Sequence, residues 1–203
     1  MADNRSDWSR LSGRGRYPVS QAGWLLNPLR RWIAPPGRTA DRLELAAGMK
    51  VLEAGCGPGW FSPELAARLP GGGLTLLDAQ AGMLDLARAR LRRAGAASFT
   101  AVQGLAEGLP FQDAVFDRIL LVTVLGETPD PNAGMREAAR VLKPGGWVCL
   151  VEAAGDPDRI RRDEADALAA AAGLAPVKAW KDLLTETFLY GRRAGPVSPR
   201  ASA

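Results

Sequence analysis

Three glycines at alternate positions follow a short apolar run that contains an acid. The run covers residues 51–54, with Glu53 as its acid, and Gly55, Gly57 and Gly59 come directly after it. Glycine adopts positive φ at little steric cost and lets a ligand approach the backbone, so such a loop can bring N–H groups close to a bound molecule. The pattern therefore predicts a buried strand that ends in a ligand-binding loop.

The spacing of these glycines argues against two common nucleotide-binding loops. A dinucleotide-binding loop reads G-x-G-x-x-G, but Trp60 occupies the third glycine position and the glycine comes one residue early. A P-loop needs Gly-Lys-Ser or Gly-Lys-Thr after its first glycine, and no such tripeptide follows here.

Polar residues also lie at the ends of later predicted strands. Asp78, followed by Ala79, ends the second predicted strand, and Thr123 lies at the end of the fourth. Open α/β sheets bind ligands beyond the carboxyl ends of their strands, so Glu53, Asp78 and Thr123 should meet at one edge of the sheet. The carboxylate of Asp78 could accept hydrogen bonds from two neighbouring hydroxyls, such as those of a ribose.

Strand-like runs and helical patterns alternate along most of the chain, which predicts an α/β fold. Such alternation requires right-handed crossovers and a mostly parallel sheet with helices on both faces. The last two strands, with only Asp182 between them, should form an antiparallel hairpin. The expected strands cover residues 49–54, 73–78, 98–103, 116–124, 146–152, 175–181 and 183–190, and the expected helices cover 23–33, 38–46, 62–69, 80–94, 132–142 and 158–172.

Two short segments have the composition of helix ends. Residues 62–64 read Ser-Pro-Glu, which combines a capping hydroxyl, a proline in the first turn and an acid near the positive end of the helix. Residues 143–146 read Lys-Pro-Gly-Gly, which predicts a helix stop before the next strand.

The glycine motif resembles the first motif of the class I S-adenosylmethionine-dependent methyltransferases, in particular the small-molecule branch that includes ubiquinone and menaquinone biosynthesis enzymes. That family's motif is an acid followed by G-x-G-x-G, and residues 53–59 match it position by position. The similarity spans roughly residues 40 to 155. It continues, in the family's order, through residues 76–78, 102–111, 116–130 and 140–146.

The resemblance implies a Rossmann-like, seven-stranded sheet with S-adenosylmethionine as the cofactor and no metal. In that family the glycine loop holds the methionine part, Glu53 would face its ammonium group, and Met83 could pack on the adenine. Leu105 replaces the aspartate that commonly bonds the adenine, so the Ala106 backbone would supply a contact there. The expected cofactor-binding residues are Glu53, Gly55, Cys56, Gly57, Gly59, Asp78, Ala79, Met83, Leu105, Ala106 and Thr123.

The chain contains no histidine, and many relatives have one at the position of Gly126. Histidine is the side chain whose ordinary pKa best suits a general base near neutral pH. Direct displacement of the methyl group can proceed without a base, because in-line positioning supplies much of the acceleration. If a base is needed, Glu127 is the first candidate and Tyr17 the second.

The expected partner is a small-molecule acceptor, and nucleic acid is an unlikely one. Methyltransferases that act on base amino groups carry Asp/Asn-Pro-Pro-Tyr where this chain has residues 123–127, and Cys149 lies inside an apolar strand rather than in a Pro-Cys nucleophile setting. Two alternatives stay open. One is a catalytically silent cofactor-binding module, suggested by Leu105 and the missing histidine; the other is an RNA methyltransferase with a basic arm as phosphate clamp.

The first forty residues differ in character from the rest. Residues 1–40 carry seven arginines against two aspartates, a net charge of +5, and hold a helical apolar face before Pro35-Pro36. We therefore expect a basic, Trp-rich arm and lid over 1–40, a methyltransferase domain over 41–193 and a flexible tail over 194–203. The face comprises Trp24, Leu25, Leu29 and Trp32.

The sequence predicts a cytoplasmic protein without a transmembrane segment. Neither Cys56 nor Cys149 has the setting of a disulfide or zinc site, and no apolar run approaches 18 residues. The basic arm is compatible with an acidic membrane surface, so peripheral membrane contact is open, as is the oligomeric state.

Overall fold

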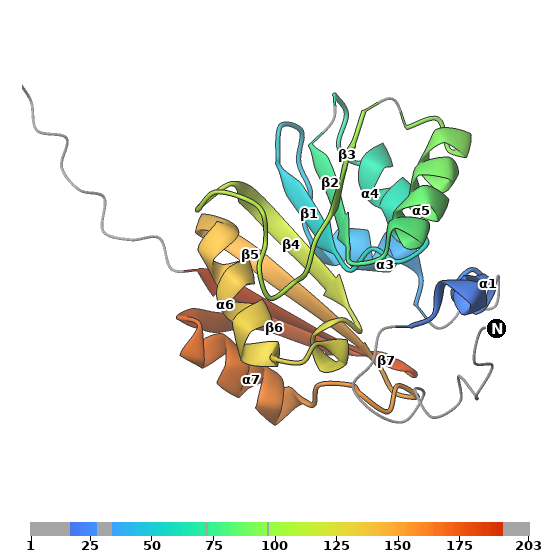
Figure 1. Ribbon diagram of the computed structural model, residues 1–203. Helices are drawn as coiled ribbons and strands as arrows, with labels where there is room; N and C mark the ends of the chain where they lie inside the picture. The colour runs from blue at the N-terminus through green and yellow to red at the C-terminus, as the bar shows by residue number, and fades with distance from the viewer. Residues whose placement is uncertain (1–16, 28–33, 72, 97, 193–203) are drawn as a thin grey trace, which may run out of the picture.

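The computed structural model describes residues 17–27, 34–71, 73–96 and 98–192. It confirms the predicted α/β, Rossmann-like class, with a seven-stranded sheet in the order β3-β2-β1-β4-β5-β7-β6 (Figure 1). Strands β1 to β5 run parallel, and β7 pairs antiparallel with both β5 and β6. The strands are β1 Val51–Ala54, β2 Leu74–Asp78, β3 Thr100–Gln103, β4 Phe116–Val122, β5 Leu142–Ala153, β6 Leu174–Lys181 and β7 Thr185–Arg192.

Helices cover both faces of the sheet, as predicted. Helices α3 to α5 lie on one side and α6 and α7 on the other (Figure 1). The 3-10 helix η2 and the one-turn helix α1 precede α3 in the N-terminal part of the chain, and the 3-10 helix η3 lies between β4 and α6. The helices are η2 Val19–Gln21, α1 Ala22–Leu25, α3 Pro36–Arg42, α4 Ser62–Ala67, α5 Ala81–Arg93, η3 Leu125–Glu127, α6 Pro131–Val141 and α7 Arg162–Ala171.

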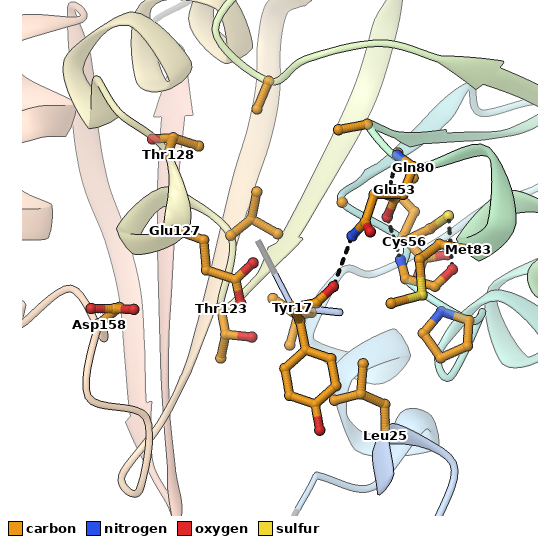
Figure 2. Close-up of a pocket in the computed structure, with 18 of the residues that line it drawn as sticks. Tyr17, Leu25, Glu53, Cys56, Gln80, Met83, Thr123, Glu127, Thr128 and Asp158 are labelled. Carbon is orange, nitrogen blue, oxygen red and sulfur yellow. Dashed lines mark hydrogen bonds between the residues drawn. The ribbon is translucent and has the colours of Figure 1, made fainter. Parts of the chain in front are cut away.

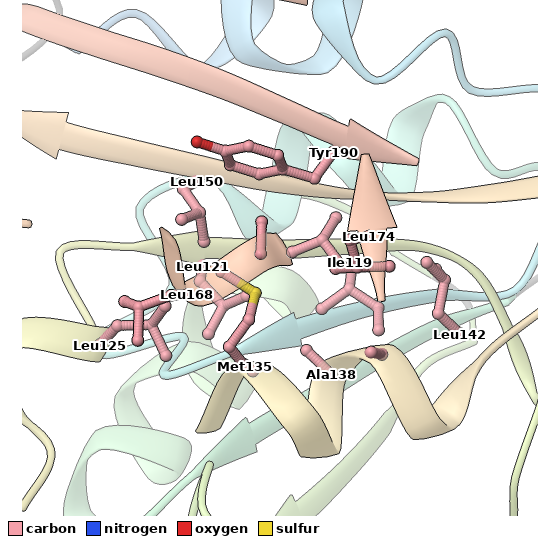
Figure 3. Packing of buried hydrophobic residues seen from close by; sticks show 14 of the residues in the cluster. Ile119, Leu121, Leu125, Met135, Ala138, Leu142, Leu150, Leu168, Leu174 and Tyr190 are labelled. Atoms are coloured by element: carbon pink, nitrogen blue, oxygen red, sulfur yellow. The ribbon is translucent and has the colours of Figure 1, made fainter. Parts of the chain in front are cut away.

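Side chains alternate between two hydrophobic cores along each central strand. In β4, Ile119 and Leu121 pack toward α6 and α7, whereas Leu120 between them packs toward α3, α4 and α5. Figure 3 shows the first core, with Met135 and Tyr190 at opposite sides of it. Each buried side chain of this size stabilises the fold by roughly 1.5–3 kcal/mol, so the sheet gives the loops at its edge a rigid support.

The predicted helix start is confirmed in position, with Pro63 and Glu64 in the first turn of α4, but the predicted capping role of Ser62 and the predicted helix stop at 143–146 are wrong. Ser62 is the first residue of α4 and its hydroxyl donates to Glu53, while the preceding Phe61 caps the helix without a side-chain hydrogen bond. Residues 143–146 lie inside β5 rather than before it. The strand begins at Leu142 because that residue already pairs with Phe116, across an irregularity in the β4–β5 register.

Three other boundaries differ from the prediction. The β6–β7 loop is longer than Asp182 alone, since β7 begins only at Thr185, whose carbonyl accepts from the Asp182 N–H at 2.8 Å. Helix α7 begins four residues late because the Asp158 N–H bonds the Asp156 carboxylate and so forms a turn there. Helix α3 begins at Pro36, in keeping with the preference of proline for the first helical turn.

Only part of the predicted arm belongs to the described residues. Of the expected helix 23–33, the structure describes α1, and Leu29 and Trp32 lie outside the described residues, as does the tail 194–203. The predicted boundary between residues 40 and 41 falls inside α3, where Ala40 is fully buried in the core. None of the helices in the described ranges combines the length and the apolar character needed to cross a membrane.

Candidate active site

A cavity of about 630 Å³ lies beyond the carboxyl ends of β1, β2, β4 and β5. The strand order reverses between β1 and β4, which is where open α/β sheets place their ligand sites. Figure 2 shows its walls, with Glu53, Cys56, Gln80 and Met83 on one side and Glu127 and Asp158 on the other. The cavity is lined by every predicted site residue except Gly59: Tyr17, Glu53, Gly55, Cys56, Gly57, Asp78, Ala79, Met83, Leu105, Ala106, Thr123 and Glu127.

The three loop glycines are required for different reasons. A Cβ on Gly55 would lie 2.3 Å from Val124 Cγ2, and one on Gly59 would lie 2.9 Å from Ala87 Cα, so both are needed for packing within the protein. Gly57, with φ of +52°, has no protein atom closer than Leu25 Cδ1 at 4.0 Å. The space beside Gly57 therefore belongs to the cavity, whereas Gly59 lies behind it.

The N–H groups of this loop bind the protein itself. Gly55 and Cys56 donate to the Leu77 carbonyl at 2.7 and 3.0 Å, and Gly57 donates to Asp78 Oδ2 at 2.8 Å. The structure thus differs from the expectation that these groups would reach a ligand. They hold the loop against β2, and the missing side chain at Gly57 leaves room for a bound molecule.

Asp78 presents a carboxylate in a fixed orientation at the end of β2. Its side chain is only 7% exposed and lines the cavity. The second oxygen, Oδ1, accepts from the Gln80 N–H at 2.9 Å. A carboxylate oxygen can accept more than one hydrogen bond, so these bonds orient Asp78 without excluding a bond to a ligand hydroxyl.

Glu53 is a buried acid on the floor of the site. Its carboxylate accepts a 2.6 Å hydrogen bond from the Ser62 hydroxyl. Burial raises the pKa of Glu53 to about 8, an effect that the Ser62 hydrogen bond reduces and the charge of Asp78 increases. A cation bound beside Glu53 would favour its charged form, which suits the ammonium contact expected there.

The turn after β3 carries the residues expected to contact the adenine. It is anchored to β2 by the Gly104 N–H, which donates to the Asp78 carbonyl at 3.0 Å. Ala106 is buried, Leu105 is 43% exposed, and both border the cavity together with Met83 from α5.

A strained residue precedes the 3-10 turn that carries Glu127. Thr123 follows β4 with φ of +52°, and its N–H donates to the Val151 carbonyl at 2.9 Å. A non-glycine residue with such a positive φ costs of order 1–3 kcal/mol, and residues of this kind cluster at functional sites.

Glu127 is a carboxylic acid with a raised pKa on the wall of the cavity. Burial raises the pKa of Glu127 to about 7, with a further increase from Asp156 and a decrease from a hydrogen bond with the Tyr17 backbone.

Tyr17 joins the two walls of the cavity through its backbone. Its carbonyl accepts from Gln80 Nε2 at 2.8 Å, while its backbone hydrogen-bonds the Glu127 carboxylate on the opposite wall. Figure 2 shows its phenol ring extending toward Leu25 and away from Glu127. The described part of the arm therefore closes one side of the site.

The contact between Gly126 and Asp158 explains why no side chain occupies position 126. A Cβ there would lie 1.7 Å from the Asp158 carbonyl oxygen. The loop after β5 thus fills the space beside Gly126, and any side chain at this position would displace the loop.

Sequence reasoning missed Gln80 and two acids, Asp156 and Asp158, all of which line the cavity. The acids follow β5, so the carboxyl-end rule applied to that strand would have found them. Among the described residues that line the cavity, none is lysine or arginine, and six are acids: Glu53, Asp78, Glu107, Glu127, Asp156 and Asp158. Within the described ranges, no three His, Cys, Asp or Glu side chains are grouped as a metal site would require.

Comparison with known proteins agrees with this geometry. Residues 51–146 match the family described as a methyltransferase domain. The demethylmenaquinone methyltransferase of Lactococcus lactis is 34% identical over 116 residues, which cover 57% of this chain and 46% of that protein. The ubiquinone/menaquinone biosynthesis C-methyltransferase UbiE of Idiomarina loihiensis is 36% identical over 116 residues, which cover 56% and 46% of the two chains.

A solved structure shares the fold over most of the chain. The crystal structure of an S-adenosylmethionine-dependent methyltransferase from Aquifex aeolicus superposes with a TM-score of 0.80 and covers 86% of this chain and 98% of the other, at 19% identity. Residues 51–146 thus match a methyltransferase domain, and the chain shares its fold with a solved S-adenosylmethionine-dependent methyltransferase. The matched region spans less than half the length of the two curated relatives.

Proposed function

We propose that this protein transfers a methyl group from S-adenosylmethionine to a small, apolar or amphipathic acceptor of the hydroquinone type. The observation that carries the proposal is the cavity itself. It joins a glycine loop that leaves room for a ligand beside Gly57 to an ionisable carboxylate, Glu127, whose pKa lies near neutrality. Relatives named for demethylmenaquinone and ubiquinone/menaquinone methylation support the acceptor class.

The residues around the glycine loop fit the proposed cofactor. Asp78 would accept the ribose hydroxyls, buried Glu53 would face the ammonium group, and Gly57 would leave room for the methionine part. When bound, the cofactor supplies an electrophilic methyl group for direct displacement. The absence of basic residues among the described lining residues suits a cationic cofactor.

Glu127 would act as the general base that removes a proton from the acceptor. A carboxylate with a pKa near 7 is partly ionised at neutral pH and can take a proton from an acceptor hydroxyl as its ring becomes nucleophilic. Tyr17 was the second candidate base, but its ring extends away from Glu127. We assign Tyr17 instead to closing the site, together with the rest of the arm.

The RNA alternative places its phosphate clamp in the basic arm, most of whose arginines lie outside the described residues, and the described lining of the cavity adds no basic side chain to that clamp. A catalytically silent module is the second candidate, because Leu105 provides no hydrogen-bond acceptor at the position where the resemblance leads us to expect an aspartate. We also propose a cytoplasmic location, which the two buried free cysteines fit.

A methyl-transfer screen separates these functions. The full chain would be incubated with S-adenosylmethionine carrying a labelled methyl group and with quinols, phenols, amines or RNA. Label in the quinol fraction supports the proposal. Binding of S-adenosylhomocysteine without label in any acceptor would support the silent module, and label only in RNA would support the nucleic-acid alternative.

A further inference from the structure

Gln80 occupies the N-cap of α5 but does not cap the helix. Serine, threonine, aspartate and asparagine are favoured at this position, because their short side chains accept from the first free N–H groups of the helix. The Gln80 side chain makes no such bond. Its amide instead donates to the Tyr17 carbonyl at 2.8 Å, while its backbone N–H donates to Asp78 Oδ1 at 2.9 Å. The contact with Tyr17, rather than the helix, therefore explains a glutamine at this position.

Gly82, two residues further along α5, faces the same part of the chain. A Cβ at this position would lie 3.0 Å from Val19 Cγ1, which is closer than ordinary van der Waals contact. Glycine weakens a helix relative to alanine, so the helix alone does not favour a glycine here. The first turn of α5 thus carries two residues that helix formation does not favour, and both adjoin the described part of the arm, residues 17–27.

Tyr17 lies between Gln80 and Glu127 (Figure 2). Its carbonyl accepts from Gln80, and its backbone also hydrogen-bonds the Glu127 carboxylate. A carboxylate accepts hydrogen bonds, so the Tyr17 N–H is the donor in that contact. Because both groups belong to one residue, a carbonyl that leaves Gln80 would also move the N–H relative to Glu127.

The charges around Glu127 make the Tyr17 bond important for its ionisation. Four acids face Glu127 from the elements around it, namely Asp156 and Asp158 from the loop after β5, Asp78 from the end of β2 and Glu152 from β5. Each of these acids disfavours the charged form of Glu127, whereas the hydrogen bond from Tyr17 favours it. Loss of that bond would keep Glu127 protonated up to a higher pH.

We propose that Gln80 is a positioning residue, which holds Tyr17 where its backbone orients the Glu127 carboxylate in the cavity. The inference rests on the proposed function, in which Glu127 removes a proton from the acceptor. Gln80 contacts Asp78 through its backbone and Tyr17 through its side chain. A change confined to the side chain should therefore disturb Glu127 and leave the bond to Asp78 intact.

The test replaces Gln80 with serine in the full chain. Serine is a favoured N-cap but is too short to reach the Tyr17 carbonyl, so Gln80→Ser should melt at the wild-type temperature or above it. Hydrogen–deuterium exchange of residues 17–27, followed by mass spectrometry, should become faster. The Glu127 carboxyl should titrate at a higher pH, as measured by NMR of a chain labelled with 13C-glutamate, in which Glu127→Gln identifies the signal.

Turnover gives a further readout of the same variant. Misplacement of a catalytic group lowers the rate without a matching loss of ligand binding, so kcat of Gln80→Ser should fall about tenfold at neutral pH while the affinity for S-adenosylhomocysteine changes less than about twofold.

Two further variants separate the contact with the arm from other effects at Gln80. Gly82→Leu should have the same effects on exchange and titration, because its side chain would occupy the place of Val19 while leucine favours the helix. Gln103→Ser is the matched control, because the Gln103 amide donates to the Ala79 carbonyl at 3.0 Å rather than to the arm. It should keep the wild-type exchange and titration.

Two results would overturn the proposal. One is wild-type exchange of residues 17–27 in Gln80→Ser; the other is an unchanged Glu127 titration, which together with a lower melting temperature would assign Gln80 to the stability of α5 alone. Neither measurement needs methyl transfer. If both behave as expected in a chain that methylates no acceptor, the proposed function fails and the positioning role stands. If transfer occurs and both stay at wild-type values, the inference alone fails.

Discussion

The backbone N–H of Gly57 donates to Asp78 Oδ2 over 2.8 Å, which makes the glycine loop after β1 and the acid that ends β2 one structural unit. Asp78 thereby has two tasks. It orients the loop, and it presents its carboxylate to the cavity. A change at either residue should therefore affect cofactor binding.

Asp78→Ala should weaken S-adenosylhomocysteine binding on the order of tenfold or more. Hydrogen bonds to charged groups contribute roughly 1.5–3 kcal/mol each, and the variant also removes the acceptor of the Gly57 N–H. Isothermal titration calorimetry measures the affinity. The affinity of Asp78→Asn should lie between those of the wild type and Asp78→Ala, because the asparagine keeps one acceptor oxygen. Wild-type affinity in Asp78→Ala would contradict the assignment of Asp78 to the ribose.

Gly57→Val should abolish cofactor binding, whereas Gly48→Val should not. Both glycines have positive φ, +52° and +81°, and neither has a protein atom nearer than 4.0 Å to a built Cβ, so the backbone penalty should be similar. Only Gly57 lines the cavity. Thermal unfolding would compare the stability of the two variants and calorimetry their binding. Equal affinities would remove Gly57 from the site.

The motif at the end of β1 and the acid at the end of β2 could be predicted because each rests on local pattern and on the carboxyl-end rule, whereas the seven-stranded, Rossmann-like arrangement was implied by the family resemblance. The role of Ser62 could not, since its hydroxyl finds Glu53, nine positions earlier, only after the chain folds. The same holds for Gly126, whose contact with Asp158 joins two loops that the sequence keeps apart. The hydrogen bonds from the glycine loop to β2 were missed, because the sequence pattern does not show whether a backbone N–H donates to a ligand or to the protein itself.

Gly126→Ala should destabilise the fold by about 1–3 kcal/mol, the usual cost of overpacking. The added Cβ would lie 1.7 Å from the Asp158 carbonyl oxygen and force the loop after β5 to move. Gly155→Ala, in the same loop, is the control, because a Cβ there meets nothing within 4 Å. Differential scanning fluorimetry should show a lower melting temperature only for Gly126→Ala, and equal melting temperatures would contradict the contact.

Glu152→Gln should make the protein more resistant to alkaline pH. Burial and the charge of Asp156 raise the pKa of Glu152 from about 4.5 to about 8, and its Oε2 has no hydrogen-bond partner. The folded state thus binds this proton more tightly than the unfolded state. The stability it contributes is complete below pH 4.5 and is lost as pH rises toward 8.

Unfolding in denaturant at pH 5 and pH 9 would measure this effect, which is on the order of a few kcal/mol because one pKa unit is about 1.4 kcal/mol. The wild type should lose more stability than Glu152→Gln between the two pH values. Glu186→Gln, which faces Glu152 across the β5–β7 pair, should follow the wild type. If Glu152→Gln loses as much stability between pH 5 and pH 9 as the wild type does, the Glu152 carboxyl is not the source of the pH dependence.

Glu127→Gln should lower kcat by roughly 100-fold, within the range usual for loss of a general base. Because the pKa of Glu127 is raised to about 7, wild-type turnover should rise with pH and level off above that value as the carboxylate ionises. The variant should lack this rise, and Glu164→Gln, on the exposed surface of α7, should keep it. A pH profile that is unchanged in Glu127→Gln would remove this residue from proton transfer.

The most direct test of the central claim is transfer of a labelled methyl group from S-adenosylmethionine to a reduced naphthoquinone, followed by mass spectrometry of the extracted product. We expect a product that carries one additional methyl group, formed by the wild type and by Gly48→Val but not by Gly57→Val. A quinol that stays unmethylated while S-adenosylhomocysteine binds, or a product that Gly57→Val forms at the wild-type rate, would contradict methyl transfer to a hydroquinone in this cavity.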